Sequence, residues 1–151
     1  MMLKKILLLL SSVLVILIFT SACANNTNSS TAQKNNQAQL VRPAPPNEFS
    51  NLTMPNLSQS DLEEGKRLYT VDCTSCHGSK GMGDGPVAAS LEPKPQPLAL
   101  TEASLSDGYL FWRISEGGQQ KPFLSAMPAW KTILNEQQIW QIIGYLRELK
   151  S

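Results

Sequence analysis

The chain has 151 residues, with 13 basic and 12 acidic side chains and a formal net charge of +1. A charge this small gives no reason to expect a nucleic-acid partner, and the length is typical of one domain with appendages. The sequence contains three cysteines and one histidine, so their spacing carries much of the chemical information.

The N-terminal segment has the pattern of a secretory signal. Two lysines precede an apolar run at residues 6–19, which only two serines interrupt, and small residues follow it. This order of a positive, an apolar and a small-residue segment predicts export. The run is short for a bilayer-spanning helix, which needs roughly 20 residues. An uncleaved membrane anchor is the alternative.

Cys23 stands directly after Ser21 and Ala22 at the end of this run. The stretch resembles the lipobox of bacterial lipoproteins, although Thr20 occupies a position where such boxes usually carry Leu. The resemblance implies that residues 1–22 form a lipoprotein-type signal peptide. Cys23 would then be lipidated and would anchor the mature protein to a membrane, facing the periplasm or another extracytoplasmic space. The alternative is ordinary cleavage nearby and a soluble exported protein.

A polar segment follows Cys23 and separates it from the rest of the chain. Residues 24–57 are rich in Asn, Ser, Gln and Pro. Such a composition does not bury enough apolar surface to offset the entropy lost on ordering. We therefore expect residues 23–57 to form a flexible tether that starts at the lipidated cysteine. The folded domain is expected to span residues 58–151.

The first helix of the domain carries two of the three cysteines. Ser60 followed by Glu63 has the spacing of a capping box, which marks a helix start. From there to Cys76, apolar and small residues recur at intervals of three and four, which places them on one helical face. The helix is expected to end near Gly78, because glycine favours the conformation that terminates helices.

Two further helices are expected, and no strand pattern stands out. One lies within residues 106–116 and ends at a Gly-Gly pair, and the other follows the capping residue Asn135 and runs toward Leu149. The connections at residues 78–100 and 117–134 are unusually long for so small a domain. Three or four helices with such loops make a thin core, so we expect another component to fill its centre.

The stretch Cys73-Thr-Ser-Cys76-His77 has the pattern C-x-x-C-H, which is the c-type haem attachment motif. Two thiols three residues apart on a helical turn reach two adjacent vinyl groups of one haem. The neighbouring imidazole then supplies a ligand to the iron. The sequence therefore predicts one covalent haem c, attached through Cys73 and Cys76, with His77 as an axial ligand.

Three other uses of these residues fit the sequence less well. A redox-active C-x-x-C pair normally starts a helix that follows a strand, whereas this one ends a helix. A structural zinc site needs four protein ligands, and only three are available once Cys23 is lipidated. A disulfide between Cys73 and Cys76 would enclose almost no chain.

Four stretches in order, "GKRLYTVDCTSCHG", "GMGDGP", "AMPAW" and "IWQIIGYLREL", resemble the bacterial single-haem class I cytochromes c. The likeness extends from about residue 58 to residue 151. It implies an all-α class I cytochrome c fold, in which three to four helices with long loops wrap around one covalent haem c. It also implies that the sixth iron ligand is a Met on the loop before the last helix, and Met127 fits this position. Met82 is too near His77 in sequence to cross to the other haem face, and Met54 precedes the domain.

The resemblance assigns further roles around the haem. Pro86 corresponds to the proline whose carbonyl accepts a hydrogen bond from Nδ1 of His77. Trp112 and Arg113 are candidates for binding a haem propionate, although a solvated helix charge is an equally good interpretation of Arg113.

The first and last helices are expected to meet where a small residue faces an aromatic one, as the resemblance implies. The residues of this contact would be Gly65 and Tyr69 on the first helix and Ile142 and Tyr145 on the last. Four lysines in the haem-covering loops would surround an exposed haem edge or simply be surface residues: Lys80, Lys94, Lys121 and Lys131.

Axial His and Met ligands leave no open position on the iron, which favours electron transfer over oxygen or peroxide chemistry. We therefore expect an electron carrier rather than an enzyme, moving single electrons between respiratory or photosynthetic redox complexes. Its partners would be donor and acceptor proteins, with no small-molecule substrate. The alternatives are a haem subunit bound permanently in a larger oxidoreductase, and a haem enzyme or sensor whose Met127 ligand is labile.

Overall fold

The computed structural model describes residues 42–149. The expected signal peptide, Cys23 and the first part of the expected tether, up to residue 41, lie outside these residues. Between residues 42 and 149 all regular structure is helical and there is no strand, as the sequence predicts. Within the same range, no helix has both the length and the apolar character needed to cross a membrane.

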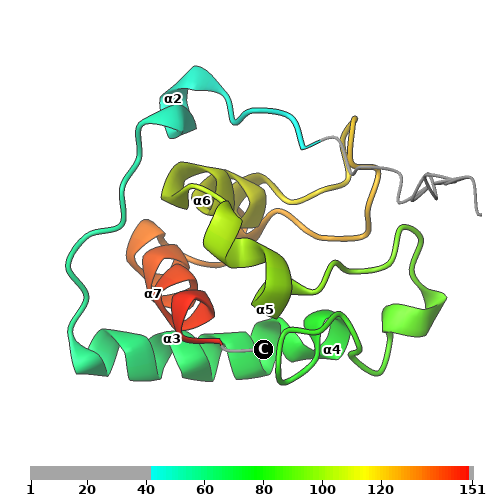
Figure 1. Ribbon diagram of the computed structural model, residues 1–151, viewed down its shortest axis with the longest axis horizontal. Helices are drawn as coiled ribbons and strands as arrows, with labels where there is room; N and C mark the ends of the chain where they lie inside the picture. Colours follow the sequence, from blue (N-terminus) through cyan, green and yellow to red (C-terminus); the bar gives the residue numbers. More distant parts are fainter. Residues whose placement is uncertain (1–41, 150–151) are drawn as a thin grey trace, which may run out of the picture. The chain divides into compact units, whose positions relative to one another are not determined.

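Three helices form the framework of the domain: α3 (Gln59–Asp72), α6 (Asp107–Glu116) and α7 (Glu136–Glu148) (Figure 1). The shorter elements are α2 (Asn47–Ser50), α4 (Thr74–His77), α5 (Leu98–Thr101) and three 3-10 turns, η1 (Ala88–Ser90), η2 (Glu102–Ser104) and η3 (Trp130–Thr132). The second and third helices predicted from the sequence are confirmed as α6 and α7. Asn135 caps α7, because its side chain accepts the N–H of Gln138 at 2.9 Å.

Helix α3 begins at a different cap from the one that the sequence suggests. The Ser58 hydroxyl accepts the N–H of Asp61 at 3.2 Å, and the Asp61 carboxylate accepts the N–H of Ser58 at 2.9 Å. The prediction of a box at Ser60 and Glu63 was therefore wrong by two residues. Ser58 keeps the extended backbone that a capping residue needs, whereas Ser60 already belongs to the first helical turn.

The main helix pair is α3 and α7, which cross where both lack side chains. The backbone carbonyl of Gln141 occupies the space that a side chain at Gly65 would fill. Gly144 gives the same kind of access to Leu62. The rings of Tyr69 and Tyr145 lie 5.4 Å apart beside this crossing. The four residues expected at this contact therefore do meet, although as two separate pairs: Gly65 lies against the backbone of Gln141 and Ile142, and Tyr69 lies against Tyr145.

The hydrophobic core lies between α3, α6 and α7. Tyr69 and the isoleucines of α7 are almost fully enclosed, with 1 % or less of their surface exposed. The core residues are Leu68, Tyr69, Leu110, Phe111, Ile114, Leu134, Ile139, Ile142, Ile143 and Leu146. Thin as it is, this core fixes the ends of α3 and α6, from which the candidate site extends.

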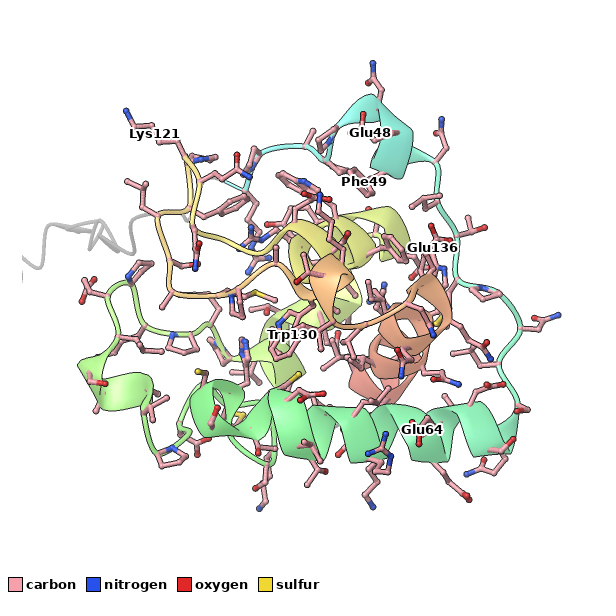
Figure 2. All side chains as sticks on the ribbon, turned by 180° about the vertical axis from the view of Figure 1, so that it is seen from behind. Glu48, Phe49, Glu64, Lys121, Trp130 and Glu136 are labelled. Atoms are coloured by element: carbon pink, nitrogen blue, oxygen red, sulfur yellow. The ribbon has the colours of Figure 1, made fainter. Side chains whose placement is uncertain are left out.

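Residues 42–57, here called the N-terminal strap, pack onto the helices instead of forming a tether. The Phe49 ring lies 6.2 Å from the Phe111 ring, and the carbonyl of Phe49 covers Gly108 (Figure 2). The N–H of Met54 donates to the Asp107 carboxylate at 3.0 Å. The folded unit therefore starts before residue 58, because the few apolar side chains in this polar segment are spaced to meet the exposed sides of α6 and α7.

Candidate functional site

The two thiols and the imidazole lie on one turn at the end of α3. Helix α3 stops at Asp72, Cys73 caps it, and the short helix α4 carries Cys76 and His77. Cys73 packs against the core, and burial raises the pKa of its thiol to about 12. Both thiols are free in the described chain. A neutral, half-buried thiol is a poor redox nucleophile, so the local chemistry argues against an oxidoreductase C-x-x-C.

His77 is half-buried, and its imidazole is neutral near pH 7. Burial lowers the pKa of its imidazole, and the backbone of Gln96 acts in the opposite direction. Its Nδ1 atom is buried, with no hydrogen-bond partner in the described part of the chain. The hydrogen bond from Nδ1 to the carbonyl of Pro86, expected from the sequence, is therefore not formed. A neutral imidazole is the form of histidine that binds a metal.

The glycine-rich segment after His77 folds back along α4. The N–H groups of Gly83 and Gly85 donate to the carbonyls of His77 and Cys76, at 2.9 Å and 3.2 Å. Gly85 lies so close that a Cβ there would collide with the carbonyls of α4. This explains the glycines in "GMGDGP" and places the exposed Pro86 directly beyond them. The imidazole side of the site is thus held by the backbone itself.

Residues 117–128, here called the Met loop, lie on the same side of the domain as α4 (Figure 1). The loop is closed at its neck, where the N–H of Gly118 donates to the carbonyl of Met127 at 2.8 Å. Gly117 has φ 68, and a Cβ there would lie 2.5 Å from the backbone of Pro128. Only glycine satisfies both requirements. The Gly-Gly pair that the sequence predicts as a helix end therefore also shapes this loop.

The three methionines of the domain have different surroundings. Met127 is half-buried and packs against the core, as does Trp130, which Figure 2 shows in the middle of the domain. Met54 belongs to the strap, and its backbone is bound to α6. Met82 is 39 % exposed and lies on the glycine-rich segment that folds along α4. Of these, Met127 is the one on a separate loop with a partly enclosed thioether.

Arg113 and Trp112, the expected propionate contacts, both face the Met loop. The Arg113 guanidinium lies 3.4 Å from the centre of the Phe123 ring and 5.8 Å from that of Trp112. Burial lowers the pKa of Arg113. Arg113 is thus not a solvated helix charge, and sequence reasoning missed its contact with the loop. The signal available was its position four residues before Gly117, with an aromatic residue at position 123.

The four loop lysines do not form one group. Lys131 pairs with Glu116 at 2.6 Å. Lys121 projects from the tip of the Met loop (Figure 2), and Lys80 and Lys94 are exposed on the glycine- and proline-rich connection. A cavity of about 460 Å³ lies elsewhere, between α2, α6 and α7, and is lined by Phe49, Phe111 and Ile139 among others. Of the residues expected around the haem, Lys131 lines this cavity, whereas the expected attachment residues and iron ligands do not.

The donors on α4 fit a haem c better than a bare metal ion. Within residues 42–149, no group of three or more His, Cys, Asp or Glu side chains is arranged to hold a metal ion. Two thiols at the spacing of one helical turn, beside an imidazole whose Nδ1 is buried, are instead the groups that covalent haem attachment requires. A small helical domain with this turn and long loops around it has the architecture of a class I, single-haem cytochrome c.

Comparison with known proteins agrees with this class. A family model described as cytochrome C oxidase, cbb3-type, subunit III matches residues 60–146. The match covers more than half of the chain, which therefore belongs to this family and carries a covalently bound haem c. No curated protein sequence matches the chain significantly.

Two solved structures match parts of the chain. One is a chain of a reducing HAO-like protein complex from Kuenenia stuttgartiensis, with 21 % identity and a TM-score of 0.55 over 65 % of this chain and 47 % of that one. The other is cytochrome CL from the marine methylotrophic bacterium Methylophaga aminisulfidivorans MPT, with 19 % identity and a TM-score of 0.46 over 62 % and 55 %. The chain thus spans about half the length of these structures.

Proposed function

We propose that the chain is an exported one-electron carrier, held at a membrane surface by a lipid on Cys23, that moves electrons between redox complexes. The observation that carries this proposal is the turn formed by Cys73 and α4, which brings both thiols of the attachment motif and the His77 imidazole together in a chain of a cytochrome c family. Cys73 and Cys76 would hold the haem covalently, and His77 and Met127 would be the protein ligands to its iron.

When bound, haem c supplies a single Fe(III)/Fe(II) couple, and the protein sets its potential. A thioether ligand favours Fe(II) because it is soft, and Met/His ligation raises the reduction potential of c-type haems. Met127 suits this role because its side chain is half-buried against the core and its carbonyl is fixed by Gly118. Met82 is less suited, because it is more exposed and lies on the segment that covers α4.

Three side chains complete the proposed haem environment. Trp112 and Arg113 lie on α6 beside the Met loop, where Arg113 has donors in addition to the one bound to Gly117. Pro86 lies beyond the segment that folds along α4, and its carbonyl remains a candidate partner for the orphaned Nδ1 of His77 once the iron holds the ring. Such hydrogen bonds fix ring orientation and ligand basicity.

A permanently bound subunit is the second candidate. The matching family is described as an oxidase subunit, and a chain of similar fold belongs to a multi-protein complex. Purification with native lipids distinguishes the two functions. A shuttle elutes alone, with a lipid-modified Cys23 at the mature N-terminus by mass spectrometry. A subunit remains with its complex after detergent extraction and gel filtration.

The ligand assignment is tested by Met127→Ala, with Met82→Ala as the matched control. The oxidised protein should show a weak sulfur-to-iron charge-transfer band in the far-red, and Met127→Ala should abolish it, lower the potential and let carbon monoxide bind ferrous iron. Met82→Ala should do none of these. A band lost with Met82 and kept without Met127 would reverse the assignment. Carbon monoxide binding to the unmodified protein would favour the enzyme or sensor function.

A further inference from the structure

Arg113, in the last turn of α6, contacts the Met loop at two separate points. Its Nη1 donates to the carbonyl of Gly117, at the neck of the loop. Its guanidinium also lies against the face of the Phe123 ring, 3.4 Å from the ring centre. A Cβ at Gly118 would come within 2.7 Å of Nη2, so the planar group fills the space between neck and ring. One side chain thus joins the two halves of the loop.

In the part of the chain that the structure describes, the partners of this guanidinium are the Met loop and aromatic rings, and not a carboxylate. Among residues 42–149, every ion pair involves another cation, so Arg113 has no carboxylate partner there. The aromatic faces of Phe123 and Trp112 take the place of part of its hydration. A cation over an aromatic face is worth more when it is partly desolvated. The contacts therefore oppose any motion that separates the loop from α6.

The Met loop itself is held by few backbone hydrogen bonds. Besides the Gly118 bond to Met127, the N–H of Ser125 donates to the carbonyl of Gly118 at 2.7 Å, and two turn bonds to the Gln120 carbonyl close the tip. Leu124 adopts φ 47, in the left-handed region that is costly for a side chain of its size. A loop with a strained tip and a narrow neck needs a contact from outside to remain closed.

We propose that Arg113 is the positioning residue that keeps the Met loop closed, and so sets how fast Met127 leaves the iron. This rests on the proposed ligation by Met127. Arg113 does not ligate the iron itself; it acts through the neck at Gly117 and the ring of Phe123.

The test measures loop opening directly. Ferric haem-loaded protein is mixed with imidazole, and loss of the far-red sulfur-to-iron band is followed over time. At saturating imidazole the rate becomes independent of its concentration and equals the rate at which Met127 leaves. Arg113→Gln should raise this limiting rate roughly tenfold or more, because it removes a partly desolvated cation from an aromatic face and a charged hydrogen bond.

Three variants separate the contacts. Phe123→Leu keeps the arginine but removes the aromatic face, and should raise the limiting rate about threefold. Arg113→Lys keeps a charged donor without the flat group and should fall between wild type and Arg113→Gln. The double variant should open no faster than Arg113→Gln alone, because both changes remove one shared contact. Arg67→Gln, at an exposed ion pair with Glu64 on α3, is the matched control and should leave the rate unchanged.

Each outcome has a defined meaning. Unchanged limiting rates in Arg113→Gln and Phe123→Leu, with the far-red band present, overturn the positioning role. The same holds if Arg113→Gln only lowers the stability to unfolding, or only shifts the reduction potential and its pH dependence, as a propionate partner would. If Arg113→Gln does not fold, the rate in Phe123→Leu decides the question alone. A wild-type protein without the band refutes Met127 ligation instead, which is a separate result.

Discussion

Alanine should affect stability differently at the two glycines where α3 and α7 cross. At Gly65 an added Cβ would meet the backbone of the facing helix, 2.5 Å from the carbonyl carbon of Gln141 and 3.2 Å from the nitrogen of Ile142. At Gly144 the nearest atoms belong to the ends of the Leu57 and Leu62 side chains. Both glycines are inside helices, so alanine at either position gains about 1 kcal/mol of helix propensity.

The two variants should therefore differ in stability because the added Cβ displaces a helix backbone at Gly65 but only side chains at Gly144. Overpacking costs roughly 1–3 kcal/mol, and the upper end applies to Gly65→Ala because two helix backbones have to separate. Its net effect should be a loss of about 2 kcal/mol in the free energy of unfolding. For Gly144→Ala, leucine side chains rotate away at about 1 kcal/mol, which the propensity gain offsets, so the net change should be near zero.

Guanidinium unfolding of the two haem-loaded variants, followed by far-ultraviolet circular dichroism, measures both effects at once. Equal denaturant slopes would show that only stability has changed. The expected result is a clearly lower midpoint for Gly65→Ala and an almost unchanged one for Gly144→Ala. If the two midpoints fall together, or if Gly65→Ala is neutral, the close backbone contact at Gly65 does not control the packing of α3 on α7.

Three further predictions concern the periphery of the domain. Phe49→Ala should cost about 2 kcal/mol in unfolding free energy, which is half the value for a fully buried ring because Phe49 is half-buried. Stability equal to wild type would mean that the strap does not stabilise the domain. Hydrogen bonds, first of all that from Ser58, lower the pKa of Asp61 to about 2. The ionised Asp61 therefore stabilises the folded state above its unfolded pKa near 4, and this contribution is lost as the pH falls toward 2. Asp61→Asn should remove this loss and flatten the acid side of the curve of stability against pH. Tyr69→Phe should cost about 1–2 kcal/mol, because the Tyr69 hydroxyl donates to the buried carbonyl of Gly78 at 2.8 Å, and unchanged thermal unfolding would contradict this.

Features that depend on neighbouring residues, such as helix caps and helix ends, were mostly predicted correctly from the sequence. The errors concern features that depend on contacts between distant parts of the chain. Asn135 and the Gly-Gly pair after α6 were found correctly, because capping and chain reversal depend on adjacent residues. The start of α3 was misplaced, since Ser58 and Ser60 both have an acidic residue three positions later. The strap was missed because composition over a whole segment hides a single well-placed side chain such as that of Phe49.

The candidate site shows the same division. C-x-x-C-H defines its attachment side from five consecutive residues, which Cys73, the cap of α3, and α4 place on one turn. The contact of Arg113 with Phe123 leaves only a weak signal in the sequence, because the two residues are ten positions apart and the sequence between them has no regular period. The sequence also does not indicate that Lys131 forms an ion pair with Glu116. Because of this pair, Lys131 is not a free charge beside the expected haem edge.

The two sides of the site are held by different kinds of interaction, which has a consequence for dynamics. On the His77 side, backbone hydrogen bonds from three alternate positions, Gly83, Gly85 and Val87, fasten the segment that follows His77 to α4. On the Met127 side, the fixed points are one neck and one arginine side chain. Segments with few backbone bonds open at lower free energy than the core they extend from. We therefore expect the Met loop to open first, so that the proposed Met127 ligand would be the one to exchange while the attachment side stays folded.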